Sequence, residues 1–438
     1  MTWRRFMPAS ALVLAIRLGG AGGGFLIQLI LARLLAPEAL GTFFSATSLA
    51  AVLALLAAWG YPNLAPRFIS RYRERNYPWL VSGFLRHAAR DTAITSLFAG
   101  LAVIAIACFW PDATADNRIA FMMAGLAVPM LALLTLNAAT AGAVRAFALS
   151  YVPESLARPL LFLGALGLLI VLKEPLTVEF ALAVFFGVTA VIALGQFLIL
   201  RQILDLGPGR RPPRLARVWR AEALPLVIVA LFTALFADLD ILMVTPFLHG
   251  ADVAAFGIAL KLALLVGFGV QVAHMIAAPD LADAHARRAL DAAGTALRRA
   301  TIFPVLLTGA ATLACLAGGQ YALALFHPDF VSAKWALTIL VFCQFLRALA
   351  GPSVQLLTII GAQRLNALLC CVALAMLAAG NTLLTPAYGV TGAAIAVALS
   401  WSVWLVLTGI MLHHRARLRS DLAFVGFRSR PAALAPAE

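Results

Sequence analysis

Five ionisable residues lie inside long apolar stretches of the sequence: Arg17, Asp238, Asp240, Lys261 and Arg347. An ionisable side chain at membrane depth costs about 2.5–3.5 kcal/mol even on the lenient insertion scale, so such residues must face protein or a water-filled cavity. Guanidinium and ammonium groups bind phosphate oxygens through charge-assisted hydrogen bonds. The three cations therefore favour an anionic ligand over a cationic one.

Arg347 lies near the middle of an apolar stretch, and Gln344 and Gln355 fall on its face at helical spacing. A polar stripe at this depth is not explained by anchoring at the membrane surface, so it predicts a cavity lining. Arg17 precedes a run of glycines, Gly19 to Gly24. That run predicts a helix that bends or unwinds beside a cavity. The alternative is that Arg17 extends to the inner interface.

Asp238 and Asp240 are about 200° apart on a helix, so they cannot both face one side. One is expected to face a cavity while the other pairs with a cation, for which Lys261 is a candidate. A structural charge pair and a contact with a coupling ion or substrate both remain open. Asn137 is a weaker cavity candidate, because uncharged amides in membranes often only join helices through hydrogen bonds.

The elements that position these residues are membrane helices. The chain has 438 residues, of which 63% are hydrophobic and 12% charged. Soluble domains carry about 25% charged residues, and a span needs about 20 apolar residues. The sequence predicts an all-α polytopic membrane protein of about twelve helices, near residues 10–33, 41–66, 91–110, 119–141, 157–172, 179–200, 223–247, 253–278, 301–325, 334–358, 365–385 and 390–412.

Arginines cluster at every second gap between these spans and are sparse at the gaps in between. By the positive-inside rule, this alternation predicts an inner-membrane protein of bacterial type with both termini in the cytoplasm. The net charge of +14 then reflects arginines that meet anionic membrane lipids, not a nucleic-acid partner.

The basic linker 201–220 contains a Gly-Pro-Gly-Arg-Arg-Pro-Pro-Arg segment that cannot continue a helix. It predicts a six-helix lobe at 1–200, a second lobe at 221–412 and a cytoplasmic tail at 413–438. Weak internal similarity between the halves indicates a parallel repeat, with the two lobes around a central cavity.

The sequence lacks the residues that several classes of function need. The five cysteines lie in apolar runs without metal-ligand spacing, and the histidines are scattered. The sequence has no phosphate-binding Gly-x-x-x-x-Gly-Lys-Ser/Thr loop, and no large external loop with a catalytic set. We expect no metal, no cofactor and no enzymatic activity.

Three segments, 31–43, 153–161 and 388–400, resemble polysaccharide flippases of the multidrug/oligosaccharidyl-lipid/polysaccharide exporter superfamily. They read Leu-Ala-Arg-Leu-Leu-Ala-Pro-Glu-Ala-Leu-Gly-Thr-Phe, Pro-Glu-Ser-Leu-Ala-Arg-Pro-Leu-Leu and Tyr-Gly-Val-Thr-Gly-Ala-Ala-Ile-Ala-Val-Ala-Leu-Ser. In these flippases they correspond to the turn after the first helix, the link into the fifth and the start of the last.

The resemblance implies a flippase for polyprenyl-diphosphate-linked oligosaccharide of the O-antigen or exopolysaccharide type. Arg17, Lys261 and Arg347 would hold the diphosphate, and other glycan-assembly membrane proteins would be partners. A drug/cation antiporter of the same superfamily would need a cavity dominated by carboxylates, which Asp238 and Asp240 keep open. A membrane glycosyltransferase or polymerase and a transport-inactive scaffold are the remaining alternatives.

Overall fold

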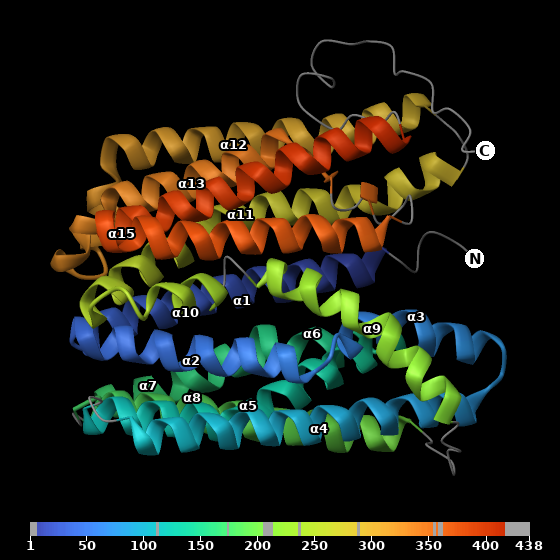
Figure 1. Cartoon of the computed structure of the whole chain (residues 1–438), viewed down its shortest axis with the longest axis horizontal. Coiled ribbons are helices and arrows are strands. Elements are labelled where there is room, and N and C mark those ends of the chain that lie inside the picture. Colours follow the sequence, from blue (N-terminus) through green and yellow to red (C-terminus); the bar gives the residue numbers. More distant parts are fainter. Residues whose placement is uncertain are drawn as a thin grey trace. The chain divides into compact units, whose positions relative to one another are not determined.

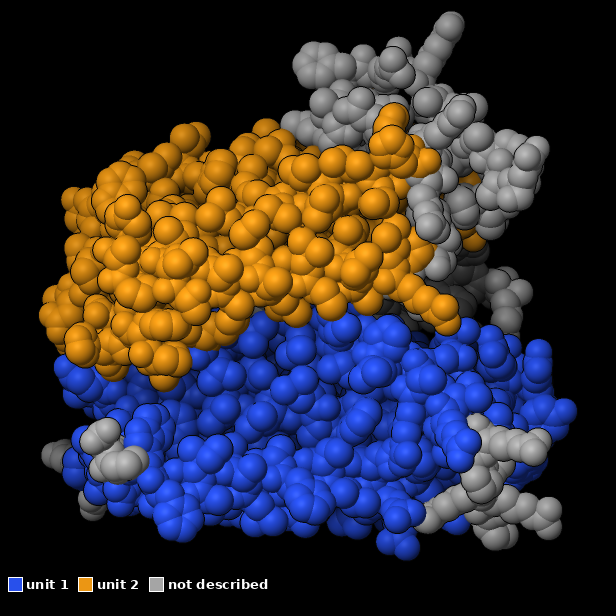
Figure 2. Space-filling model, viewed as in Figure 1, with its two compact units in different colours: residues 1–242 blue, residues 243–438 orange. Residues whose placement is uncertain are grey.

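The computed structural model is helical, and its described residues contain no strand. Those residues are 7–110, 114–172, 175–204, 213–234, 238–286, 290–353, 356–357 and 362–416. The chain forms two compact units, Met1–Leu242 and Met243–Glu438 (Figure 2). Each unit has its own set of packed helices, which Figure 1 labels along the sequence.

The first unit begins with two helices and a basic helical hairpin and ends with two shorter helices. Its elements are α1 (Met7–Leu34), α2 (Pro37–Ala57), α3 (Tyr61–Glu74), α4 (Pro78–Phe109), α5 (Ala115–Ala143), α6 (Phe147–Val152), the π-helical turn η2 (Pro153–Ala157), α7 (Arg158–Leu172), α8 (Val178–Ile203), α9 (Pro213–Thr233) and α10 (Asp240–Val244).

The second unit contains fewer and longer helices. They are α11 (Gly250–Ala286), α12 (Leu290–Ala324), the 3₁₀ turn η4 (Pro328–Ala333), α13 (Lys334–Leu349) and α15 (Gln363–Ala416). Within this unit α11, α12 and α13 pack on one another, and α15 packs on α13 and α11.

Local sequence signals explain where several helices begin. Pro37 and Pro78 each occupy the first turn of a helix, where a missing N–H costs no hydrogen bond. Thr114 and Thr177 cap α5 and α8 by accepting from the backbone N–H three residues later, at 3.3 Å in both cases. Gly60 separates α2 from α3 in a left-handed conformation (φ 72°).

In the first unit α5 packs on α2, α3, α4 and α8, so it forms the centre of the helix packing. The aromatic rings of Phe43, Phe162 and Phe185 contact one another between α2, α7 and α8, with centroid separations of 5.4–6.5 Å. The outer helix faces are apolar as well: Phe109 is 84% exposed and Val171 77%. Apolar surface of this extent suits lipid rather than water.

Among the described residues, ten helical segments are long and apolar enough to cross a membrane. The prediction of about twelve spans agrees with this number once two cases are considered. The expected seventh span runs across residues 235–237, which lie outside the described residues; on either side are α9, ending at Thr233, and α10, beginning at Asp240, and the backbone N–H groups of Asp238 and Leu239 donate to the Ala234 carbonyl. The expected eleventh and twelfth spans are joined in α15, which leaves helical geometry at Gly389 (φ 57°, ψ −138°).

The packing of α9 bears on the division of the chain. This helix contacts α2, α3 and α4, all in the first unit. The contacts therefore keep the chain up to Leu242 with the first unit, although the sequence placed the start of the second lobe at residue 221. The repeat between the two lobes stays a prediction.

Candidate functional site

Arg17 lies half-buried on α1 of the first unit. Its guanidinium carbon is 5.2 Å from the centroid of the Tyr151 ring on α6, a cation–π contact. Within the described residues it has no ion pair and no hydrogen bond. Its N–H donors are therefore not committed to a carboxylate.

The glycine run behind Arg17 does not unwind α1, which is helical from Met7 to Leu34, so the prediction of an unwound helix was wrong, and a bend beside a cavity stays a prediction. The glycines instead allow close packing. A Cβ on Gly20 would overlap the backbone carbonyl of Ser155 in η2, and one on Gly23 would approach the Pro159 ring at 3.1 Å. Gly22 faces open space. One face of the run is thus fitted to the π-helical turn.

Arg347 lies on α13 of the second unit, and its guanidinium carbon is 5.5 Å from the Trp401 ring centroid on α15. Gln344, one turn earlier, is 0% exposed, and neither atom of its amide has a hydrogen bond within the described residues. The second residue of the predicted polar stripe, Gln355, lies outside the described residues. Lys261 is half-buried on α11 of the same unit.

Asp240 is the first residue of α10, and Asp238 lies two residues before it, with its backbone N–H donating to the Ala234 carbonyl at 3.0 Å. The Ser48 hydroxyl of α2 donates to Asp238 at 3.4 Å. Asp240 is 0% exposed, and neither of its carboxylate oxygens has a hydrogen bond within the described residues. The two carboxylates thus have different environments, as their angular separation on a helix predicts.

Asn137 is 5% exposed and donates from Nδ2 to the Ala193 carbonyl at 3.0 Å. This bond joins α5 to α8 inside the first unit. It is the interhelical role that the sequence left open as the alternative to a cavity lining, and a cavity contact by Asn137 stays a prediction.

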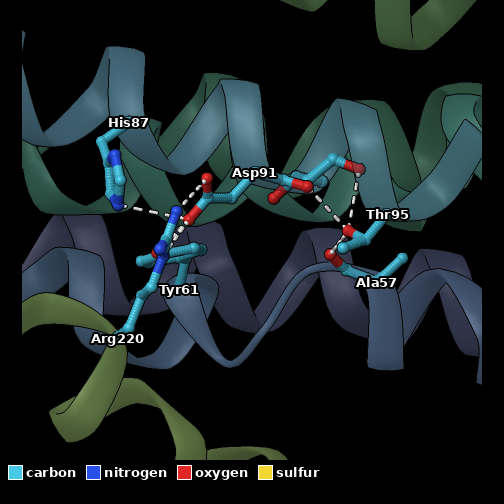
Figure 3. Close-up of polar contacts among 7 residues, drawn as sticks. Ala57, Tyr61, His87, Asp91, Thr95 and Arg220 are labelled. Atoms are coloured by element: carbon cyan, nitrogen blue, oxygen red, sulfur yellow. Dashed lines mark hydrogen bonds and ion pairs between the residues drawn. The ribbon is translucent and has the colours of Figure 1, made fainter. Parts of the chain in front are cut away.

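A polar cluster in the first unit was not predicted from the sequence (Figure 3). We call it the α9 clasp and define it by Tyr61, His87, Asp91 and Arg220. The Arg220 guanidinium of α9 donates to both carboxylate oxygens of Asp91 on α4, at 2.8 and 2.9 Å. The Tyr61 hydroxyl donates to Asp91 at 2.8 Å, and His87 Nε2 lies 3.2 Å from the same carboxylate.

Neighbouring contacts support the α9 clasp. The Trp219 indole donates to the Tyr72 hydroxyl at 3.0 Å, and a Cβ on Gly60 would overlap the Ala223 carbonyl of α9. The hydrogen bonds to Asp91 raise the pKa of the Arg220 guanidinium, which therefore stays charged. The sequence signal was Asp91 itself, a single acid between a run of arginines and an apolar span.

Metal binding has no structural support in the part of the chain that the structure describes. No group of three or more His, Cys, Asp and Glu side chains there could hold a metal ion.

No protein-family model matches the sequence, and no curated protein matches it significantly. Solved structures do match. An inward-facing multidrug resistance MATE transporter of the MOP superfamily superposes with a TM-score of 0.74 at 13% identity, over 93% of this chain and 98% of that one. The chain has the fold of these transporters.

Two further matches extend the comparison. The lipid II flippase MurJ, in an inward closed conformation, gives a TM-score of 0.72 at 10% identity, over 92% of this chain and 87% of that one. A MOP superfamily transporter from Pyrococcus furiosus, described as having a binding pocket of reverse polarity, gives 0.61 at 15% identity, over 93% and 95%. At these identities the similarity establishes the fold of a multi-pass membrane protein.

Proposed function

We propose that this protein is a flippase that moves polyprenyl-diphosphate-linked oligosaccharide from the cytoplasmic to the outer leaflet of a bacterial inner membrane. Alternating access between the two sides would carry the substrate. The fold supports the proposal, because it is shared with the lipid II flippase MurJ. The three segments that resemble polysaccharide flippases support the class of substrate.

The observation that carries the proposal is the environment of the arginines in the apolar helices. Arg17 and Arg347 each lie over an aromatic ring, and neither has a carboxylate partner among the described residues. A cation–π contact contributes about 0.5–2 kcal/mol and leaves the guanidinium N–H groups free to donate. Those groups match the oxygens of a diphosphate, which Arg can bind in a bidentate manner.

The residues then have separate roles in the proposal. Arg17, Lys261 and Arg347 bind the diphosphate, and Gln344 adds an amide donor beside Arg347. One of Asp238 and Asp240 pairs with a cation, or the two carboxylates take up the coupling ion. Anionic lipids surround the basic cytoplasmic end, and other glycan-assembly membrane proteins supply and remove the substrate.

One observation favours a second function, export of a cationic drug by antiport. Asp240 is a fully buried carboxylate without a hydrogen bond in the described part of the chain. A buried carboxylate is a natural site for a proton or cation, and the fold is also that of MATE transporters. The two functions differ in the sign of charge that the cargo needs.

The test is glycan export in cells whose native gene is replaced by one that encodes the Arg17→Gln or the Arg347→Gln variant. We expect at least tenfold less surface glycan, lipid-linked oligosaccharide accumulating inside, and a normal protein level in the membrane. Arg67→Gln is the control, because Arg67 is an exposed arginine paired with Glu222.

Ethidium efflux from the same cells distinguishes the alternative. Normal glycan export in both variants, together with ethidium efflux that Asp240→Asn abolishes, would show the antiporter and reject the flippase. Normal glycan export without any efflux would reject both.

A further inference from the structure

A second set of buried polar groups lies between α11 and α13 of the second unit. On α11, Gly267 and His274 are two turns apart and therefore on one face, and on α13, Gln344 and Arg347 are one turn apart on one face. The two faces oppose each other. A Cβ on Gly267 would overlap the Gln344 amide oxygen, His274 follows Gly267 by two turns on α11, and Arg347 follows Gln344 by one turn on α13.

Two of these side chains are buried without their hydrogen bonds. Gln344 is 0% exposed and His274 is 3% exposed. Within the described residues, Gln344 Nε2 and His274 Nε2 have no partner. A buried donor without an acceptor costs free energy, so each such group in a native protein calls for an occupant.

Arg347 adds an uncompensated charge to the same place. The Trp401 ring covers one side of its guanidinium, and no carboxylate among the described residues pairs with it. A water molecule could accept from the amide or the imidazole, but it would not offset the charge. An anion offers acceptors to buried donors of this kind and also neutralises a guanidinium.

We propose that the second unit binds a small inorganic anion, chloride or phosphate, between α11 and α13, held by Arg347, Gln344 and His274. The near-complete burial of Gln344 and His274 restricts the occupant in this conformation to a small ion, and the diphosphate of the proposed substrate would take its place at Arg347 during transport. His274 donates through Nε2, either as the neutral Nε2–H tautomer or when protonated. The anion stabilises the packing of α11 on α13 while no substrate is bound, and the inference shares Arg347 with the proposed function.

The experiment is thermal unfolding of the purified full chain in lipid nanodiscs at constant ionic strength. Sodium gluconate is replaced stepwise by sodium chloride or, in a separate series, by sodium phosphate. We expect a saturable rise in Tm of several degrees with one of the two anions, because a ligand that binds only the folded state stabilises it by mass action. The series that responds identifies the ion.

Three variants test the assignment of residues. Arg347→Gln is expected to abolish the rise, and Gln344→Leu to shift its midpoint to about tenfold higher anion concentration. Arg158→Gln is the matched control, because Arg158 in the first unit also lies over an aromatic ring, Phe185 at 5.4 Å. It should keep the wild-type response.

A second readout does not depend on the stability of the variants. Crystals of the wild-type protein grown with bromide should show an anomalous peak between His274 and Arg347. The proposal is overturned if the wild-type Tm responds equally to gluconate, chloride and phosphate, or if Gln344→Leu and Arg347→Gln respond as wild type does. Neither readout involves transport, so failure here leaves the proposed flippase function standing, and loss of that function leaves this site standing.

Discussion

The arginines of this chain differ in what their guanidinium groups contact. Arg67 and Arg220 are paired with Glu222 and Asp91, in contacts that join α9 to α3 and α4. Arg17 and Arg347, inside apolar helices, lie over aromatic rings. The first kind of contact uses the guanidinium for structure, and the second leaves its N–H groups available for a ligand.

The two paired arginines, Arg220 and Arg67, are not expected to contribute equally to stability, because their ion pairs differ in geometry and burial. The Arg220–Asp91 contact is bidentate, and the Asp91 side chain is only 11% exposed. Replacing Arg220 by Ala should lower the free energy of unfolding by about 1 kcal/mol, since a bidentate charge-assisted contact is lost and Asp91 stays buried without it, although the Arg220 side chain itself is 51% exposed. The measurement is the Tm of the purified protein.

Arg67→Ala is the internal control for this loss. The Arg67–Glu222 pair also joins α9 to its neighbours, but its side chains are 53% and 35% exposed. Exposed pairs contribute about 0–1 kcal/mol, so the Tm should change little. Equal losses in the two variants would mean that the α9 clasp does not fix α9.

At the scale of elements, the contact between α1 and the turn η2 is the tightest fit that the glycine run makes. Gly20→Ala should destabilise the protein by about 1–3 kcal/mol, because the added methyl overlaps the Ser155 carbonyl and neither backbone can yield locally. Gly22→Ala should be neutral or stabilise α1 by up to about 1 kcal/mol, since its side faces open space.

The comparison of these two alanine variants needs only Tm and membrane yield. Both substitutions favour the helical backbone of α1 equally, so any difference between them reports the contact with η2. Two variants of equal stability would contradict the close packing.

Sequence reasoning reached the helices but not all of their contacts. Apolar stretches and arginine gaps located the apolar part of the spans, because both signals are local. The helix ends were less well predicted: α4 begins at Pro78 and α12 at Leu290, before the expected starts at 91 and 301, because helices continue beyond their apolar part. The glycines of α1 were misinterpreted because their role depends on η2, a partner distant in sequence. His274 was passed over for the same reason, as its neighbour Arg347 lies on another helix.

At the scale of the whole molecule, each unit contains one arginine of the kind proposed to bind phosphate. Arg17 belongs to the first unit and Arg347 to the second. The proposal therefore gives each unit its own contact with the phosphate oxygens. The direction of release then depends on which end of the helices faces the cytoplasm.

Orientation is therefore the prediction that decides the direction of transport. The exposed arginines near the end of α3 include Arg73, whereas Ser332 in η4 is exposed between α12 and α13. Because arginine-rich ends are retained in the cytoplasm, Arg73 should lie inside and Ser332 outside. In a variant without the five native cysteines, Ser332→Cys should react with a membrane-impermeant maleimide in intact spheroplasts. Arg73→Cys should react only after permeabilisation. The reverse labelling pattern would mean that the protein has the opposite orientation and would contradict outward flipping.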